Sequence, residues 1–412
     1  MRPSSLKMSA PRVLLGLAAV LVSAAATAGA SPLVREQSTI VAPYACTTLA
    51  VSFSLSSSEP RSTLDCGPAG RKWTRCGSHR RFAVGRWPPA CWRPYAADSP
   101  INTPVPANPR IHPNSTAYVA RLLSLGRIGK VVGNVKPRYD WQVPYYFSSR
   151  SDPLFKLDFT AKWGADGGFG SVGKSIEGRR IRIPGAARYA GQGSRQTHPD
   201  ADLTVINQSS GWVYDLYHVQ SKPAGGGRIV SRWGGRTRIR GNAFKGGEAT
   251  AWGGGRLAGV VRAQEWISGK INHALYVVVA CTSGRHVRPA YHGAARCSDT
   301  TDALPAGARL WLDYSEAEIK AAPWPRWKKT LVRAWATYGG YVADTGGSGF
   351  NPIQIESPET YRSFGFADPL VRWARTRRGV SWSGRRPVFD LAAGIDWAGR
   401  LRVLDWKDAA NR

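Results

Sequence analysis

The sequence is short of acidic residues and, after its first segment, of long apolar runs. Asp and Glu total 27 against 57 Lys and Arg, which gives a formal net charge of +30. A basic surface favours polyanionic partners such as acidic polysaccharide, although an Arg-rich genome can produce the same balance. No stretch after Val22 reaches the roughly 20 apolar residues of a transmembrane helix, so we expect no membrane span in the mature chain.

Several motifs of known chemistry are missing. The six cysteines include no Cys-x-x-Cys pair, which argues against a structural zinc site. There is no Gly-x-Ser-x-Gly elbow to support a hydrolase triad, and no His-Glu-x-x-His to support a metalloprotease. Residues 168–175, GFGSVGKS, do match a phosphate-binding loop, but the IEGRRIRIPG that follows is poor helix material. We therefore expect no nucleotide, no metal and no other cofactor.

Residues 1–30 have the pattern of a secretory signal peptide. Three basic residues precede an apolar run from Val13 to Val22, and Ala28-Gly29-Ala30 offers small residues for cleavage. We expect this segment to be removed and the mature chain to be secreted, either extracellular or associated with the cell envelope. An uncleaved anchor is the alternative.

The cysteines suit an oxidising compartment. Cys281 and Cys297 flank a polar loop between two expected strands, and we predict a disulfide between them. Four more cysteines lie in the N-terminal fifth of the chain, where we expect two local disulfides whose pairing is open: Cys46, Cys66, Cys76 and Cys91.

The chain divides by composition into a basic N-terminal extension, residues 31–97, and a larger domain, residues 98–412. From Cys66 to Tyr95 there are seven Arg or Lys, three Trp and no acidic residue. Basic residues interleaved with aromatic rings can hold a polyanion by charge and stacking. Alternatively, this part is a disulfide-linked flap whose tryptophans pack inward.

Short strands between Gly and Pro residues dominate the larger domain, and helices are few. A helix is expected after Asn114, a second one in SEAEIKAA with a capping box of Ser315 and Glu318, and a third in RWKKTLVRAWATYGG. This pattern favours a mainly β fold, a β-sandwich or jelly roll with a few short peripheral helices. The clearest strands are 202–207, 211–220, 273–280, 308–314, 340–345 and 399–406.

The strand GWVYDLYHVQ is the first candidate for a binding site. Alternation puts Trp212, Tyr214, His218 and Gln220 on one face, where aromatic rings and polar tips suit a sugar. An ordinary half-exposed sheet face has the same pattern. Asp215 lies on the other face among apolar neighbours and needs a partner such as an arginine.

Four other residues could carry acid–base chemistry. Asp200 and Asp202 are two apart, so an extended chain places them on one side, where they could act as an acid–base pair or hold calcium. Alternatively, they simply close a turn. His273 begins an apolar strand and Glu265 precedes it by eight residues. A carboxylate beside an imidazole fixes its charge or tautomer, whereas a core histidine only donates to a carbonyl.

The order of five segments resembles a group of secreted microbial proteins. The segments are HPDADLTVIN, GWVYDLYHVQ, RLAGVVRAQEWISGKINHAL, LPAGARLWLDY and ATYGGYVADTGG. The group shows an Asp-x-His or similar triplet, a Tyr-Asp-x-Trp strand, an acidic residue before Gly-x-Ile-x-His-Ala-Leu, and a Tyr-Gly-x-Tyr-x-x-Asp turn. The resemblance covers about residues 100–406 and implies a jelly-roll, carbohydrate-type architecture without a settled activity. Asp202 stands in place of the expected His, and Tyr217 in place of the expected Trp.

These observations favour an exported glycan-active enzyme, a glycoside hydrolase or polysaccharide lyase, and the polysaccharide that we expect it to act on is anionic. A hydrolase needs two carboxylates roughly 5–10 Å apart, for which the candidates are Glu265, Asp215, Asp200 and Asp202. A lyase base could come from His218, His273 or Tyr214, aided by Gln220. The alternatives are a non-catalytic lectin-like carbohydrate-binding protein and an envelope-associated structural protein. We expect a monomer.

Overall fold

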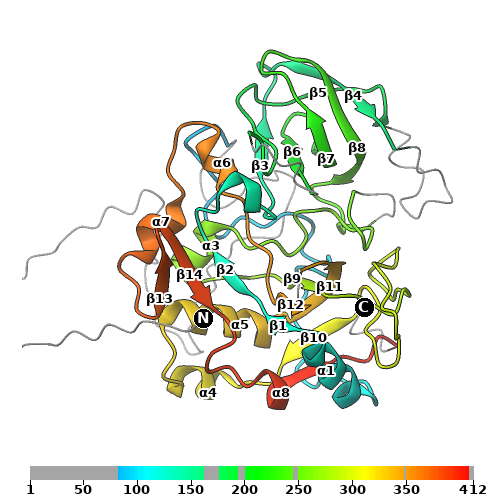
Figure 1. Cartoon of the computed structure of the whole chain (residues 1–412), viewed down its shortest axis with the longest axis vertical. Coiled ribbons are helices and arrows are strands. Elements are labelled where there is room, and N and C mark those ends of the chain that lie inside the picture. Colours follow the sequence, from blue (N-terminus) through cyan, green and yellow to red (C-terminus); the bar gives the residue numbers. More distant parts are fainter. Residues whose placement is uncertain (1–81, 162–175, 194–199, 245–248, 348, 408–412) are drawn as a thin grey trace, which may run out of the picture. The chain divides into compact units, whose positions relative to one another are not determined.

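The described part of the chain is mainly β, as the sequence predicts, and its strands form four sheets with helices between them (Figure 1). All described residues belong to one compact unit, Cys46–Arg412. None of the helices among the described residues is long and apolar enough to cross a bilayer. The computed structural model describes residues 82–161, 176–193, 200–244, 249–347 and 349–407.

The largest sheet has six strands in the order β3–β6–β7–β8–β4–β5. The β3–β6 and β4–β8 pairs are parallel, and the others are antiparallel. Both faces of β7 are covered: Tyr214 and Leu216 pack into one core, while Val213 and Asp215 are buried on the opposite face. The strands are β3 (Tyr145–Ser148), β6 (Leu203–Asn207), β7 (Trp212–Ser221), β8 (Gly227–Arg238), β4 (Leu154–Phe159) and β5 (Arg180–Arg182).

A four-stranded sheet has the order β15–β10–β11–β9, and its β9–β11 pair is parallel. The apolar run LYVVV makes β9 a central element of the main core, which fits a strand covered on both faces. Helix α5 packs Trp327, Leu331 and Trp335 into the same core and is followed by Gly339 at a φ of 67°. The strands are β15 (Leu401–Val403), β10 (Arg309–Leu312), β11 (Gly340–Thr345) and β9 (Leu275–Val279).

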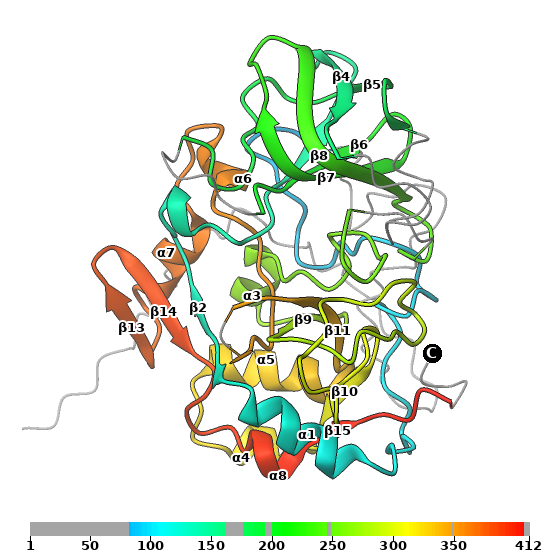
Figure 2. The same ribbon diagram turned by 45° about the vertical axis from the view of Figure 1, so that its right-hand side comes forward.

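Two smaller sheets complete the β structure. In one, the hairpin of β13 (Val380–Ser383) and β14 (Arg386–Asp390) pairs with β2 (Lys130–Val132), and Figure 2 shows the three strands side by side. In the other, β1 (Arg127–Ile128) pairs with β12 (Gly349–Phe350).

The three predicted helices are confirmed, and the capping box of Ser315 and Glu318 is formed at α4. The helices are α1 (Ser115–Ser124), α3 (Ala263–Ser268), α4 (Glu316–Ala321), α5 (Arg326–Thr337), α6 (Glu359–Arg362), α7 (Pro369–Ala374) and α8 (Trp397–Arg400), with a 3-10 turn η1 (Pro137–Tyr139).

The described end of the N-terminal extension, residues 82–97, packs inward. Trp87 and Trp92 are both buried, and Arg262 donates a hydrogen bond to the backbone oxygen of Trp92 at 2.5 Å. Trp73 lies outside the described residues. The tryptophans that are described therefore stabilise the core, as expected for an inward-packed flap.

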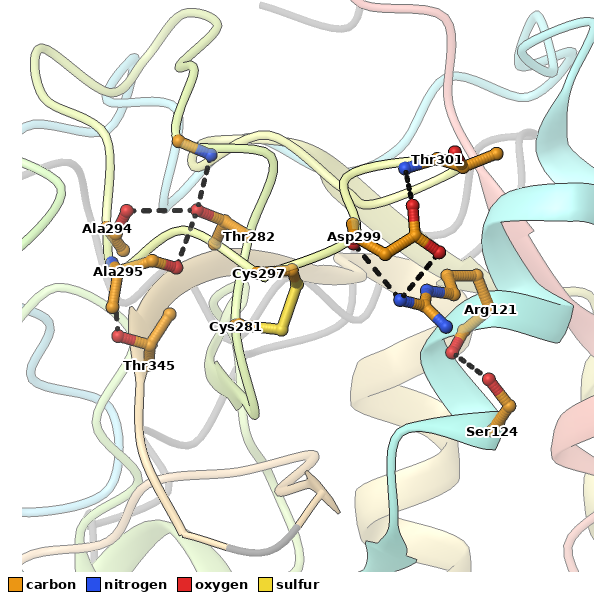
Figure 3. The surroundings of a disulfide bond; sticks show 11 residues. Arg121, Ser124, Cys281, Thr282, Ala294, Ala295, Cys297, Asp299, Thr301 and Thr345 are labelled. Carbon is orange, nitrogen blue, oxygen red and sulfur yellow. Dashed lines mark hydrogen bonds and ion pairs between the residues drawn. A yellow bond between two sulfur atoms is a disulfide. The ribbon is translucent and has the colours of Figure 1, made fainter.

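The predicted disulfide between Cys281 and Cys297 is confirmed (Figure 3). Beyond Cys297, Asp299 pairs with Arg121 of α1 at 3.4 Å, which joins the cross-linked loop to that helix. Cys91 is disulfide-bonded as well, whereas the other three N-terminal cysteines and the GFGSVGKS segment lie outside the described residues.

The finer expectation of a jelly-roll sandwich is not confirmed. A jelly roll is built from antiparallel strands, whereas the pairs β3–β6, β4–β8 and β9–β11 are parallel. Local alternation and turn residues predict that strands form, but they do not say which strands become neighbours.

Candidate functional site

A pocket of about 900 Å³ opens where β2, β7, β9 and β11 meet. This volume suits a small ligand or one segment of a polymer, because ligand pockets usually measure roughly 300–1,000 Å³. Residues 139, 141–143, 351 and 353–355 also line it. The polar and aromatic lining includes Lys130, Tyr139, Trp141, Asp200, Tyr217, Arg256, Tyr276, Asp344 and Arg386.

Asp200 and Asp202 reach the site because the chain before β6 continues to pair with β7. The backbone N–H groups of His218 and Val219 donate to the carbonyl oxygens of Asp200 and Ala201 at 2.8 and 2.9 Å. Asp200 lines the pocket, and Asp202 lies behind it with 2% of its surface exposed. The chain between the two aspartates is not extended, because Ala201 has a φ of 39°, but its backbone hydrogen bonds to β7 hold Asp200 and Asp202 near the pocket.

Asp344 enters the pocket from β11 at an irregularity in the sheet. The β9–β11 register shifts between Val342 and Asp344, and such bulges redirect side chains next to functional sites. The Asp344 carboxylate accepts hydrogen bonds from the Tyr276 hydroxyl at 3.1 Å and from the Thr345 N–H at 2.8 Å. Two donors therefore hold this carboxylate in place.

Arg256 is the buried cation at the centre of the site. Its Nη1 lies 2.9 Å from Asp202 Oδ2, and its Nη2 donates to the carbonyl oxygen of Ala249 at 2.7 Å. Its backbone N–H donates to Asp215 Oδ2 at 3.0 Å, while Thr204 donates to the other oxygen of Asp215 at 2.8 Å. The arginine partner expected for Asp215 is therefore present, through its main chain.

The site holds more carboxyl groups than cations. We call Asp200, Asp202, Asp215 and Asp344, together with Arg256, the aspartate cluster. Burial raises the pKa of all four carboxyl groups, and Arg256 opposes this effect in each case. The neighbouring carboxylates further raise the pKa of Asp202 and Asp344. Oδ1 of Asp202 has no hydrogen-bond partner among the described residues.

This imbalance gives the cluster acid–base capacity. Burial favours the neutral form of Arg256, but the surrounding carboxylates outweigh that and raise its pKa, so it remains the fixed positive charge. One arginine cannot compensate four buried carboxylates, so the cluster retains protons that exposed aspartates would have lost. A protonated carboxyl beside an ionised one is the arrangement that general acid–base catalysis requires.

Exposed aromatic rings border the pocket on the side of η1. Tyr139 is 47% exposed and Trp141 is 48% exposed. The carbonyl oxygen of Trp141 accepts a hydrogen bond from Gln354 Nε2 at 2.6 Å, and Gln142 Nε2 donates to the carbonyl oxygen of Val132 at 2.7 Å. The backbone around Trp141 is therefore fixed, while its ring faces solvent at the pocket.

The predicted residues of strand β7 lie on two faces. Asp215 belongs to the aspartate cluster, and Tyr217 on the same face lines the pocket. On the other face Tyr214 is buried in a core, and Trp212 lies beneath the guanidinium groups of Arg236 and Arg238, 4.1 and 3.8 Å from its ring centroid. Among the described residues that line the pocket, Trp212, Tyr214, His218 and Gln220 do not occur.

Glu265 and His273 meet in a second buried cluster. His273 Nε2 lies 3.4 Å from Glu265 Oε2, and Arg262 Nη2 lies 2.9 Å from Glu265 Oε1. Burial alone would raise the pKa of Glu265, but Arg262 and His273 outweigh it and lower that pKa. Both Glu265 and His273 are at most 3% exposed, and neither lines the described pocket.

A second glutamate joins this arrangement from the segment after β12. Glu356 Oε1 accepts from the Tyr361 hydroxyl at 2.6 Å and from the Ala263 N–H at 2.7 Å. Burial raises the pKa of Glu356 to about 7. We call Arg262, Glu265, His273, Glu356 and Tyr361 the Glu265 cluster. It joins α3, the segment before β9 and α6 to residues 82–97, which Arg262 contacts.

The sequence patterns do not single out Arg256, Tyr276 or Asp344. Asp344 is the last residue of the Tyr-Gly-x-Tyr-x-x-Asp turn, so the motif itself was the available signal. Arg256 and Tyr276 stand in ordinary apolar surroundings, and only folding shows that they contact aspartates. No group of three or more His, Cys, Asp or Glu side chains in the described ranges has the geometry to hold a metal ion.

Comparison with known protein families, with curated proteins and with solved structures found no match to this chain.

Proposed function

We propose that this protein is an exported glycoside hydrolase whose acid–base pair is Asp200 and Asp344. The observation that carries the proposal is a pocket of about 900 Å³ with two carboxyl groups of raised pKa inside it and two exposed aromatic rings at its border. Carboxyl pairs cleave glycosidic bonds, and flat rings suit the apolar faces of sugars.

The surroundings of the two carboxyl groups assign their roles. Asp344 accepts two hydrogen bonds, which favour its ionised form. The Asp200 carboxyl group has no such donor among the described residues, and burial raises its pKa. In the proposed reaction Asp200 donates its proton to the glycosidic oxygen as the bond to the anomeric carbon breaks. Asp344 takes the proton of the water that attacks this carbon.

Arg256 and Asp202 support this pair from behind the pocket. The guanidinium group limits how far the pKa of each carboxyl rises, because its charge favours the ionised forms. Asp202 holds the guanidinium at 2.9 Å and is too buried to meet a substrate. Both are positioning residues.

Hydrolysis is favoured over elimination by the state of the two tyrosines at the pocket. A lyase would use a histidine or a tyrosine as its base. Neither His218 nor His273 is among the described residues that line the pocket, which leaves Tyr217 and Tyr276. Burial raises the pKa of Tyr217, and it raises the pKa of Tyr276 well above the usual value, with Asp344 adding to the effect. A phenolate base is therefore disfavoured at either position.

A lectin-like binding protein is the second candidate. The exposure of Tyr139 and Trp141 favours it, because stacking on these rings needs no catalytic group. Binding without turnover would distinguish this candidate from the hydrolase.

A substrate panel tests the proposal. The protein lacking residues 1–30 is incubated with neutral and acidic polysaccharides, and new reducing ends and unsaturated uronates are measured separately. We expect new reducing ends without ultraviolet absorbance from unsaturated products, and none from Asp344→Asn. Unsaturated products would identify a lyase. Binding to a polysaccharide without any cleavage would support the lectin-like binding protein.

A further inference from the structure

Next to the acidic pocket lies a rim of cationic side chains. Lys130 and Arg386 line the pocket itself, on the neighbouring strands β2 and β14. Asn134 Nδ2 donates to the carbonyl oxygen of Arg385 at 3.1 Å, which holds the turn of the hairpin against the segment that leads to η1. Figure 2 shows β14 beside β2. We call Lys136, Arg138, Arg385 and Arg386 the cationic rim.

The rim charges are not neutralised within the described structure. Lys130 pairs with Asp390 at 2.9 Å, but no ion pair to a described carboxylate occurs at any of the four rim residues. Lys136, Arg138 and Arg385 are exposed. These cations are therefore available to an anionic ligand.

Two of the rim residues are held in place before any ligand binds. Arg386 donates to the carbonyl oxygen and the hydroxyl of Ser383 at 3.3 and 2.9 Å across the hairpin. The guanidinium group of Arg138 lies 4.6 Å from the ring centroid of Tyr139. A preorganised guanidinium group loses less conformational entropy when it binds a carboxylate.

The position of the rim relative to the acids restricts the ligand. Anionic groups are repelled by Asp200 and Asp344 inside the pocket, and they are attracted to the rim outside it. Tyr139 and Trp141 line the same pocket and are exposed, so they offer stacking surfaces to sugar rings. A polymer whose units carry carboxylates fits this arrangement when a carboxylate on a unit flanking the reacting bond reaches the rim.

We propose that the cationic rim binds the carboxylates of an acidic polysaccharide and thereby selects uronate-containing chains for the pocket. The inference rests on the proposed function for the pocket as a glycan site, and it does not require that the bound chain is cleaved. The net charge alone predicts only that the protein binds polyanions, whereas this inference assigns the binding to four side chains.

The test measures binding of polygalacturonate, with its highly methyl-esterified form as the uncharged counterpart. An Asp344→Asn background removes turnover. In that background, Arg385→Gln with Arg386→Gln and, separately, Lys136→Gln with Arg138→Gln are each expected to weaken polygalacturonate binding by about 3- to 10-fold, as for the loss of two partly exposed ion pairs. Binding of the esterified polymer should change less than twofold.

The matched control is Arg372→Gln with Arg375→Gln. Arg372 of α7 and Arg375, the residue that caps its C-terminus, are exposed and lie outside the pocket lining. The control should bind polygalacturonate like the background protein. A circular dichroism melt of each variant confirms that it is folded, and the use of two separate rim variants keeps the test decisive if one of them does not fold.

Three results would overturn the inference. They are equal loss of binding in rim and control variants, no preference for polygalacturonate over its ester, and a rim effect that occurs with a single-stranded oligonucleotide but not with polygalacturonate. Rim-dependent binding of polygalacturonate, combined with no cleavage of any polysaccharide by the wild type, would uphold the rim and refute the hydrolase. Cleavage of neutral polysaccharide only, unaffected by the rim substitutions, would support the hydrolase and refute the role of the rim.

Discussion

The aspartate cluster and the Glu265 cluster are both buried and both built around an arginine, yet they differ in charge balance and access. Arg256 faces four carboxyl groups, two of which line a pocket. In the Glu265 cluster, Arg262 and His273 contact Glu265, while Glu356 accepts hydrogen bonds from Tyr361 and the Ala263 N–H. No residue of this cluster is in the described pocket lining. An excess of protonatable groups open to a ligand suits catalysis, whereas a balanced and closed network suits cohesion of the fold.

The largest effect should come from replacing the ionised member of the acid–base pair. Asp344→Asn keeps the size of the side chain but removes the base, and turnover should fall by about 10³-fold. Steady-state rates on the active polysaccharide provide the measurement. Asp98→Asn, an exposed aspartate outside the pocket, is the control and should retain full turnover. Normal turnover by a folded Asp344→Asn would place the chemistry elsewhere, with the Glu265 cluster as the next candidate.

The second largest effect should be a loss of stability when the Glu265 cluster is changed. Glu265→Gln leaves Arg262 buried without its charged partner, so the free energy of unfolding should drop by about 3–5 kcal/mol. Turnover per folded molecule should stay near that of the wild type. Denaturant titration measures the first quantity, and active-site titration with kinetics measures the second.

A matched surface pair provides the control for this change. Glu316→Gln breaks the exposed pair with Arg333 and should cost less than about 1 kcal/mol. The comparison of the two clusters would fail if Glu265→Gln were as stable as the wild type but inactive, because Glu265 would then be the catalytic carboxylate.

The free energy of unfolding should depend on pH because Glu356 of the Glu265 cluster is buried. Glu356 has a pKa of about 7 in the folded protein against 4.5 as the reference for the unfolded chain. The folded state therefore binds this proton more tightly, and the free energy of unfolding falls as pH rises from about 4.5 to about 7. A difference of about 2.5 pKa units corresponds to roughly 3 kcal/mol.

Glu356→Gln should remove this contribution, which denaturant titrations at about pH 5 and about pH 8 would detect. Asp140, whose pKa burial also raises to about 7, should leave a second decline of the same sign in the variant. An unchanged slope in Glu356→Gln would show that Glu356 is ionised throughout this range.

The smallest effect should come from the exposed ring at the border of the pocket. Trp141→Ala removes a stacking surface, and glycan binding should weaken about fivefold, since ring contacts contribute roughly 0.5–1.5 kcal/mol. Trp382→Ala is the control, because Trp382 is 41% exposed but lies outside the pocket lining. Calorimetric titration with the active polysaccharide distinguishes the two variants, and equal losses would show that the pocket border has no special role.

Local patterns in the sequence indicate three members of the aspartate cluster. Asp200 and Asp202 are conspicuous because two acids precede an apolar strand, and Asp215 because it interrupts one. The alternation in this strand also favours Trp212 and Tyr214 as sugar-binding residues, because aromatic residues alternate in the same way on a buried face and on a ligand-binding face. The sheet shows that the opposite face, with Asp215 and Tyr217, is the one near the pocket.

Local chemistry determined the strands, the capped and amphipathic helices and the Cys281–Cys297 bridge, because each depends on residues close in the chain. Only the tertiary structure decided that Asp200, Arg256 and Asp344 share one site while Glu265 and His273 lie in another. These neighbours come from separate strands and loops, and their burial and mutual electrostatics arise when parallel and antiparallel strands pair across long stretches of sequence.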